Sequence, residues 1–112
     1  MTVGSNCKLV RVEYDGDAPV SIGSESLIGA DVRFTTRTHE LGNSARRRSY
    51  VDIDKPITVG SGVWIPQRSL LMPGVSVADG CVIAPGAIVT ASTEPNGLYG
   101  GVPARRIRDL GE

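Results

Sequence analysis

The sequence predicts an all-β protein whose chain winds into a parallel β-helix, and three features support this prediction. From Val59 to Val89 an aliphatic residue returns at every sixth position, and a small or compact residue stands four positions after almost every one. A period of six matches neither the 3.6-residue period of a helix nor strand alternation. The 14 glycines and 7 prolines among 112 residues favour frequent turns over long helices. The aliphatic residues are Val59, Ile65, Leu71, Val77, Ile83 and Val89, and the compact ones are Val63, Ser69, Val75, Cys81 and Ala87.

Each unit of six residues is expected to form one short strand and one corner, so that three units make a triangular coil of about 18 residues. The residues at the first and fifth positions then point toward the coil axis, and stacked coils stabilise one another. The same pattern occurs upstream, in units that begin at Ile22, Ile28 and Phe34. We therefore expect a single β-helical domain over residues 1–112, in which residues 1–20 form an N-terminal cap and the first coil.

The two blocks of repeats are out of phase, because Phe34 and Val59 are 25 residues apart, one more than a multiple of six. Residues 40–56 are therefore expected to leave the coil as a loop, and their Gly, Asn, Ser and consecutive Arg residues are unfavourable in strands. If the chain rejoined the β-helix one coil of about 18 residues later, the excess would be about seven residues. Loops that leave a rigid scaffold often carry binding residues.

The repeat ends after Thr90, where Glu94-Pro95-Asn96-Gly97 predicts a turn. Residues 103–110 are expected to form a short helix, because proline is tolerated in a first helical turn. The predicted fold is thus all-β, with one loop excursion and a short C-terminal helix.

The composition excludes several kinds of function. Twelve basic and 12 acidic residues give a net charge of +0, which provides no electrostatic footprint for nucleic acid or an anionic membrane. No apolar run approaches the ~20 residues of a membrane span. Cys7 and Cys81 form no paired motif, and 1 histidine cannot build a site that needs two or three. We expect no metal, no nucleic-acid partner, no membrane insertion and a cytoplasmic location.

Four stretches of the chain carry a further signal. They are Thr36-Arg37-Thr38-His39; Lys55–Gly60 with Val63-Trp64-Ile65; Leu71–Val75; and Ala87–Thr90 with Gly101–Ile107. In order and spacing they resemble the hexapeptide-repeat acyltransferases, and specifically the sugar O-acetyltransferase group that includes maltose and galactoside acetyltransferases. This resemblance implies a left-handed β-helix, an exception to the right-handed crossover rule. It also implies a homotrimer with active sites between subunits, acetyl-CoA as co-substrate and a hydroxylated small molecule as acceptor.

The resemblance makes His39 the general base that takes a proton from the acceptor. Imidazole titrates near neutral pH, and such catalysis typically contributes about 10²–10⁴-fold. No nucleophile of the enzyme is needed, because the acceptor can attack the thioester directly. A backbone N–H near Gln67 is a candidate for stabilising the oxyanion. The alternative for His39 is an exposed histidine with no role.

Trp64 occupies the same repeat position as His39, and a seven-residue excess would place the two on one face, one coil apart. An outward tryptophan either lines the acceptor pocket or is buried in the trimer interface. Arg47, in a run of three arginines, is a candidate for binding an acidic acceptor or the 3′-phosphate of CoA, although a charged run in a loop is often only solvated.

Four residues are assigned to CoA. Arg105 and Arg108 are three apart, hence on one side of the expected helix. The resemblance places them at the phosphates of CoA, whose oxygens suit guanidinium groups, whereas the alternative is a solvated terminal helix. Pro85 and Thr90 match positions that line the CoA groove.

The leading function is therefore transfer of an acetyl group from acetyl-CoA to a hydroxyl of a sugar or similar molecule. The same chemistry on an amine or on an antibiotic hydroxyl is a second enzymatic possibility. A third is a non-catalytic β-helix that serves as a scaffold, which CoA binding would distinguish from an enzyme.

Overall fold

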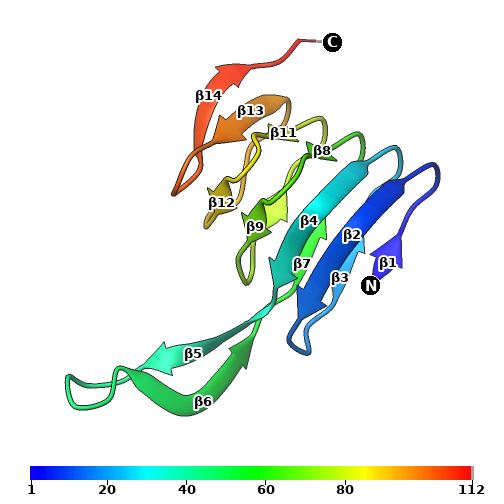
Figure 1. Cartoon of the computed structure of the whole chain (residues 1–112). Coiled ribbons are helices and arrows are strands. Elements are labelled where there is room, and N and C mark those ends of the chain that lie inside the picture. The colour runs from blue at the N-terminus through cyan, green and yellow to red at the C-terminus, as the bar shows by residue number, and fades with distance from the viewer. Residues whose placement is uncertain (112) are drawn as a thin grey trace.

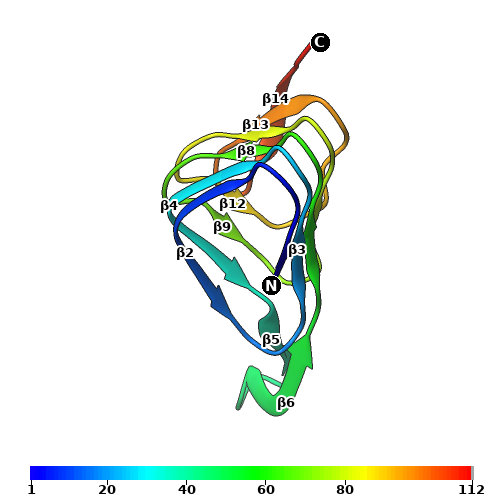
Figure 2. The same ribbon diagram turned by 90° about the vertical axis from the view of Figure 1, so that its right-hand side faces the viewer.

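The computed structural model describes residues 1–111, whose strands wind into a triangular parallel β-helix. Figure 1 shows the coils stacked from the N-terminal strands to the C-terminal ones, and Figure 2 looks nearly along the axis, where the coils superimpose as a triangle. No segment of these 111 residues forms a helix with the length and apolarity needed to cross a bilayer.

Parallel pairing stacks the strands into three sides. Side 1 consists of β1 (Thr2–Val3), β3 (Val20–Ile22), β7 (Ile57–Val59) and β10 (Ser76–Val77). The long strands β2 (Lys8–Asp15) and β4 (Leu27–Thr35) contribute their first halves to side 2 and their second halves to side 3. Side 2 continues with β8 (Trp64–Ile65), β11 (Val82–Ile83) and β13 (Gly97–Gly100), and side 3 with β9 (Leu70–Leu71) and β12 (Ile88–Val89).

The register confirms the repeat of three units per coil. Thr58 pairs with Ser76 on side 1, and Leu70 pairs with Ile88 on side 3, so partners in adjacent coils are 18 residues apart. The first-position residues from Val59 to Val89 are at most 4% exposed, and all five compact fifth-position residues are at most 2% exposed. Because burial of one such aliphatic side chain contributes about 1.5–3 kcal/mol, the six-residue period defines the core that holds the coils together.

The chain leaves the β-helix after β4 as a two-stranded antiparallel hairpin, formed by β5 (Arg37–Leu41) and β6 (Arg48–Asp54) (Figures 1 and 2). It returns at β7, where Val59 pairs with Ile22. Partners across this junction are 37 residues apart rather than 18, so the insertion is 19 residues long. The expected excess of seven residues was wrong, because the chain rejoins on the next side of the triangle and not one coil later.

The predicted helix over residues 103–110 was also wrong. The tail forms β14 (Arg105–Asp109), which pairs antiparallel with β13. An isolated helix of eight residues is marginal in water, whereas β13 offers an unpaired edge on its free side. The Arg106 guanidinium strengthens this pairing, because it donates hydrogen bonds to the Tyr99 hydroxyl at 3.1 Å and to three backbone carbonyls between Glu94 and Asn96.

Candidate functional site

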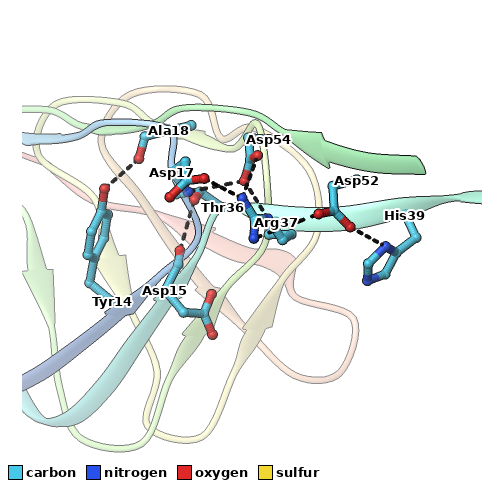
Figure 3. Close-up of polar contacts among 9 residues, drawn as sticks. All are labelled: Tyr14, Asp15, Asp17, Ala18, Thr36, Arg37, His39, Asp52 and Asp54. Atoms are coloured by element: carbon cyan, nitrogen blue, oxygen red, sulfur yellow. Dashed lines mark hydrogen bonds and ion pairs between the residues drawn. The ribbon is translucent and has the colours of Figure 1, made fainter. Parts of the chain in front are cut away.

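The hairpin places the only histidine directly opposite a carboxylate. His39 on β5 pairs with Asp52 on β6, and the imidazole Nδ1 lies 2.9 Å from Asp52 Oδ1 (Figure 3). The His39 side chain is 27% exposed, and its Nδ1 atom is buried. The orientation of the ring does not align Nδ1 for a hydrogen bond with Asp52. The two atoms are therefore within ion-pair distance but do not form a hydrogen bond. Within residues 1–111, Nε2 has no ion-pair or hydrogen-bond partner.

Arg37 fixes this pair to the body of the β-helix. It lies directly opposite Asp54 in the hairpin and donates to that carboxylate through Nε and Nη2, both at 3.1 Å. Nη2 also binds Asp17, in the corresponding corner of the first coil, and Nη1 lies 3.8 Å from Asp52 (Figure 3). Asp52 therefore stands between the Arg37 guanidinium and the His39 imidazole.

The Asp17–Arg37–Asp54 network shifts the pKa values of Arg37 and Asp54. The hydrogen bond from Arg37 lowers the pKa of Asp54 below its ordinary value of 3.8, and the backbone N–H of Asp17, 3.1 Å from Asp54 Oδ1, acts in the same direction. The hydrogen bonds to Asp54 and Asp17 raise the pKa of Arg37 in turn. The base of the hairpin is thus held by charges that persist across the whole neutral range.

A histidine with one ring nitrogen against a carboxylate and the other free is suited to general-base chemistry. In such an arrangement a carboxylate orients the ring and stabilises an imidazolium formed by protonation at the other nitrogen. The role that the resemblance implies for His39 stays a prediction.

A groove of about 610 Å³ lies at a different corner of the triangle, between sides 2 and 3. The groove contains one predicted CoA residue, Pro85, together with Gln67. Arg11 and Asp31 form an ion pair of 3.0 Å along its wall, and a hydrogen bond from Arg11 together with the charge of Arg68 lowers the pKa of Asp31. With two guanidinium groups and one carboxylate, the lining of the groove has a net positive charge. The lining residues are Arg11, Ala30, Asp31, Gln67, Arg68, Pro85 and Gly86.

Trp64 does not lie beside His39, as the seven-residue excess had implied. It is 49% exposed on side 2, where β8 pairs with β4 opposite Leu27 and with β11 opposite Val82. The prediction failed for the reason given above, since the 19-residue hairpin returns the chain to side 1 before Trp64 is reached. Trp64 and Leu27 instead form an exposed apolar strip on the outside of the prism.

The remaining predicted CoA residues lie near the C-terminal end. Arg105 and Arg108 are exposed on β14, so they do not share one side of a helix. Thr90 is exposed directly after β12, and the segment before Arg105 lies along that strand, since Ile88 bonds with the backbone of Gly101 and Ala104. Within the described residues, neither arginine makes an ion pair.

The tip of the hairpin carries the three consecutive arginines. Arg46 lies over the ring of Tyr50, 3.7 Å from its centroid, and Arg47 donates to the Gly42 carbonyl at 3.4 Å. All three arginines are exposed.

Sequence reasoning missed Asp52, Asp54 and Asp17 as partners of the site, and it read Arg37 only as part of a motif. A signal was available: Arg37 and His39 alternate before the Gly-Asn-Ser turn, and Asp52 and Asp54 alternate after it. In an antiparallel hairpin such patterns place opposite charges face to face. Among residues 1–111 there is no cluster of three or more His, Cys, Asp or Glu side chains that could hold a metal ion.

Comparison with known proteins identifies relatives of this chain. Residues 56–91 match the family described as bacterial transferase hexapeptide (six repeats). The chain is 35% identical over 116 residues to the galactoside O-acetyltransferase of Escherichia coli K12, covering 97% of this chain and 57% of that protein.

Solved structures that resemble this chain are also acetyltransferases of the hexapeptide-repeat type. A hexapeptide-repeat acetyltransferase from Vibrio cholerae, complexed with acetyl-coenzyme A, superimposes with a TM-score of 0.87 at 33% identity, covering 98% of this chain and 60% of that one. A galactoside acetyltransferase in complex with coenzyme A gives a TM-score of 0.80 at 32% identity, covering 97% and 55%. The fold of these proteins is the left-handed β-helix, which confirms the predicted fold class apart from the terminal helix. The chain spans about half the length of the curated relatives it matches.

Proposed function

Since this chain belongs to the hexapeptide-repeat family of bacterial transferases, we propose that it moves an acetyl group from acetyl-CoA to a hydroxyl of a sugar or similar small molecule. The observation that carries this proposal is the His39–Asp52 pair, with Nδ1 2.9 Å from the carboxylate and Nε2 without a partner. The related galactoside O-acetyltransferase supports an oxygen acceptor.

In the proposed reaction, acetyl-CoA supplies the thioester as co-substrate. His39 Nε2 takes the proton from the acceptor hydroxyl as that oxygen attacks the thioester carbon, and it returns the proton to the departing sulfur. Asp52 holds the imidazole in place and stabilises its charged form, while Arg37, with Nη1 3.8 Å from Asp52, positions that carboxylate. No covalent enzyme intermediate is involved.

The groove between sides 2 and 3 is the proposed site of the donor. Pro85 lies in its wall, while Thr90 directly follows β12, and Arg105 and Arg108 are on β14 toward the C-terminal end. Guanidinium groups without ion-pair partners are suited to phosphate oxygens, so Arg105 and Arg108 are the proposed phosphate ligands. The backbone N–H of Gln67, in the same groove, is the proposed oxyanion donor.

The proposed assembly is a homotrimer, and the positions of these parts support an active site between chains. The hairpin with His39 leaves the corner between sides 3 and 1, whereas the groove follows the corner between sides 2 and 3. Two corners of one prism point in different directions, so base and donor come together between two chains. The exposed Trp64 and Leu27 on side 2 would then be covered by a neighbouring subunit or face the acceptor from it. Free thiols at Cys7 and Cys81 are consistent with a cytoplasmic location.

Calorimetric titration with acetyl-CoA tests the donor, with an Arg105→Ala/Arg108→Ala variant beside the native protein. The expected result is micromolar binding near one site per chain that is at least tenfold weaker in the variant. Thiol release from acetyl-CoA in the presence of a galactoside then tests the reaction, and His39→Ala should abolish it while leaving acetyl-CoA binding intact. Absence of acetyl-CoA binding by the native protein would contradict the proposed function and favour a scaffold.

A further inference from the structure

We propose that the acceptor of this chain carries a negative charge, such as a carboxylate, which Arg46 and Arg48 bind at the tip of the hairpin. This inference rests on the proposed function and names the substrate class of the same site.

The tip arginines have no ion-pair partner among the described residues, whereas the arginines at the base of the hairpin and along the first coils are already paired with carboxylates. Arg11, Arg33 and Arg37 each form an ion pair with an aspartate or glutamate. Within residues 1–111, no carboxylate pairs with Arg46, Arg47 or Arg48. The middle residue, Arg47, contacts the turn itself through the Gly42 carbonyl. Arg46 and Arg48 therefore offer two charges that no carboxylate among residues 1–111 neutralises.

The carboxylates of the hairpin strands either contact other side chains already or lie on the face of the hairpin away from His39. Asp52 and Asp54 are engaged by His39 and Arg37. Glu40, which follows His39 on β5, occupies the alternate strand position and is expected to face away from it. Between His39 and the tip, an approaching ligand thus meets cations without neutralising partners.

The pairing of the two strands brings this charge close to the base. Beyond the His39–Asp52 pair, the next pair toward the tip is Leu41 with Arg48. Between these two pairs, β6 contains two more residues than β5. Two residues along β5 correspond to about 7 Å, which sets the separation of the Arg48 backbone from the catalytic pair along the strand. An Arg side chain can span that distance, so one small molecule can present a hydroxyl to His39 and an anionic group to Arg48.

The irregular stretch of β6 also shapes the tip. Bulges re-aim side chains and are frequent beside active sites. Here Tyr50 is 78% exposed, and the Arg46 guanidinium stacks over its ring, 3.7 Å from the ring centroid. Stacking on an aromatic face reduces the number of positions this long side chain samples, so less conformational entropy is lost when it binds an anion. Guanidinium forks match carboxylate, phosphate and sulfate oxygens, which defines the class of ligand.

A matched pair of glycosides tests the inference: para-carboxyphenyl β-D-galactoside and its para-carboxamide, which share every sugar hydroxyl and differ by one charge. We expect the native protein to show a KM at least tenfold lower for the carboxylate, a preference that declines as salt is added. Arg46→Gln/Arg48→Gln should raise the KM of the carboxylate to that of the amide and leave the KM of the amide and of acetyl-CoA unchanged. Lys8→Gln removes an exposed charge on the first coil and is the matched control, in which the preference should persist.

Direct binding of the same two glycosides, measured by saturation-transfer NMR with His39→Ala in the presence of acetyl-CoA, separates this inference from the proposed reaction. Preferential binding of the carboxylate that disappears in Arg46→Gln/Arg48→Gln supports the inference even if no transfer occurs. Equal binding of the two glycosides, or binding of neither, overturns it. A variant that weakens acetyl-CoA instead, with both glycosides affected alike, also overturns it and assigns the arginines to the donor.

Discussion

His39 and Asp52 face each other across the hairpin, with Nδ1 of the imidazole 2.9 Å from Oδ1 of the carboxylate. The residues are separated by the whole turn in sequence, and they meet only because β5 and β6 pair in this register. The same register places Arg37 opposite Asp54. The Arg37–Asp54 pair, which anchors the hairpin, therefore lies next to the His39–Asp52 pair, which is suited to proton transfer.

Asp52→Asn should lower kcat by about 10–100-fold while leaving the KM of acetyl-CoA unchanged. The amide keeps the size of the side chain but no longer stabilises the imidazolium that forms during the reaction. Steady-state kinetics with a saturating acceptor measure this effect. Glu40→Gln, one residue from His39 and without an ion-pair partner among the described residues, is the control and should stay within about twofold of native. A full rate in Asp52→Asn would remove this carboxylate from the mechanism.

Arg37→Ala should loosen the hairpin without unfolding the β-helix. The substitution removes the hydrogen bonds that join Asp17 and Asp54, and it leaves these two carboxylates and Asp52 near one another without their cation. Limited proteolysis should then cut between residues 40 and 48 at least tenfold faster than in the native protein, with the coils remaining intact. Arg33→Ala removes an ion-paired arginine from side 3, and it should not speed this cleavage.

Acid should release the hairpin before it unfolds the coils. The pKa of Asp54 is lowered in the folded state, so its contribution to stability is fully present above its unfolded value, near 3.8, and is lost as the pH falls through the lower folded value. Hydrogen-exchange protection factors in β5 and β6 should therefore fall below pH 4 while those of β8 and β11 persist. Simultaneous loss of protection in both regions would show that the hairpin is not an independent unit.

Leu71→Ala should destabilise the protein by about 2–5 kcal/mol, because it removes a side chain with 0% exposure from the coil axis and leaves a cavity. Leu70→Ala is a matched control, since the neighbouring residue on β9 points outward and is half-buried. Urea denaturation at one fixed protein concentration compares the two variants, because association would otherwise contribute to the apparent stability. Equal losses for both would mean that the outer face of side 3 is as enclosed as the core.

Trp64→Glu should dissociate the proposed trimer. A carboxylate in place of an indole that is 49% exposed in the single chain would introduce an unpaired charge into a subunit contact on side 2. Sedimentation velocity should show the native protein at three chain masses and the variant shifted toward one. Thr58→Glu on the polar side 1 is the control. A native protein that sediments as a monomer would contradict both the trimer and an active site between subunits.

Some parts of the structure could be predicted because they repeat locally. The six-residue period identifies Ile65, Leu71 and Ile83 as core residues from their positions alone, and the phase shift between the two blocks indicates that the chain leaves the coil before Val59. Each of these features depends on residues a few positions apart, so their signal survives in the linear sequence.

Other parts depended on pairing between distant segments. The sequence by itself determined the buried core positions of the β-helix, the alternation of short strands and corners, and the candidate base, His39. Only the tertiary structure decided that the tail becomes β14 on the open edge of β13, that the hairpin returns on side 1 and separates Trp64 from His39, and that Asp52 stands against the imidazole. The physical reason is that edge availability and hairpin register are set by backbone hydrogen bonds between segments far apart in sequence, which no local period encodes.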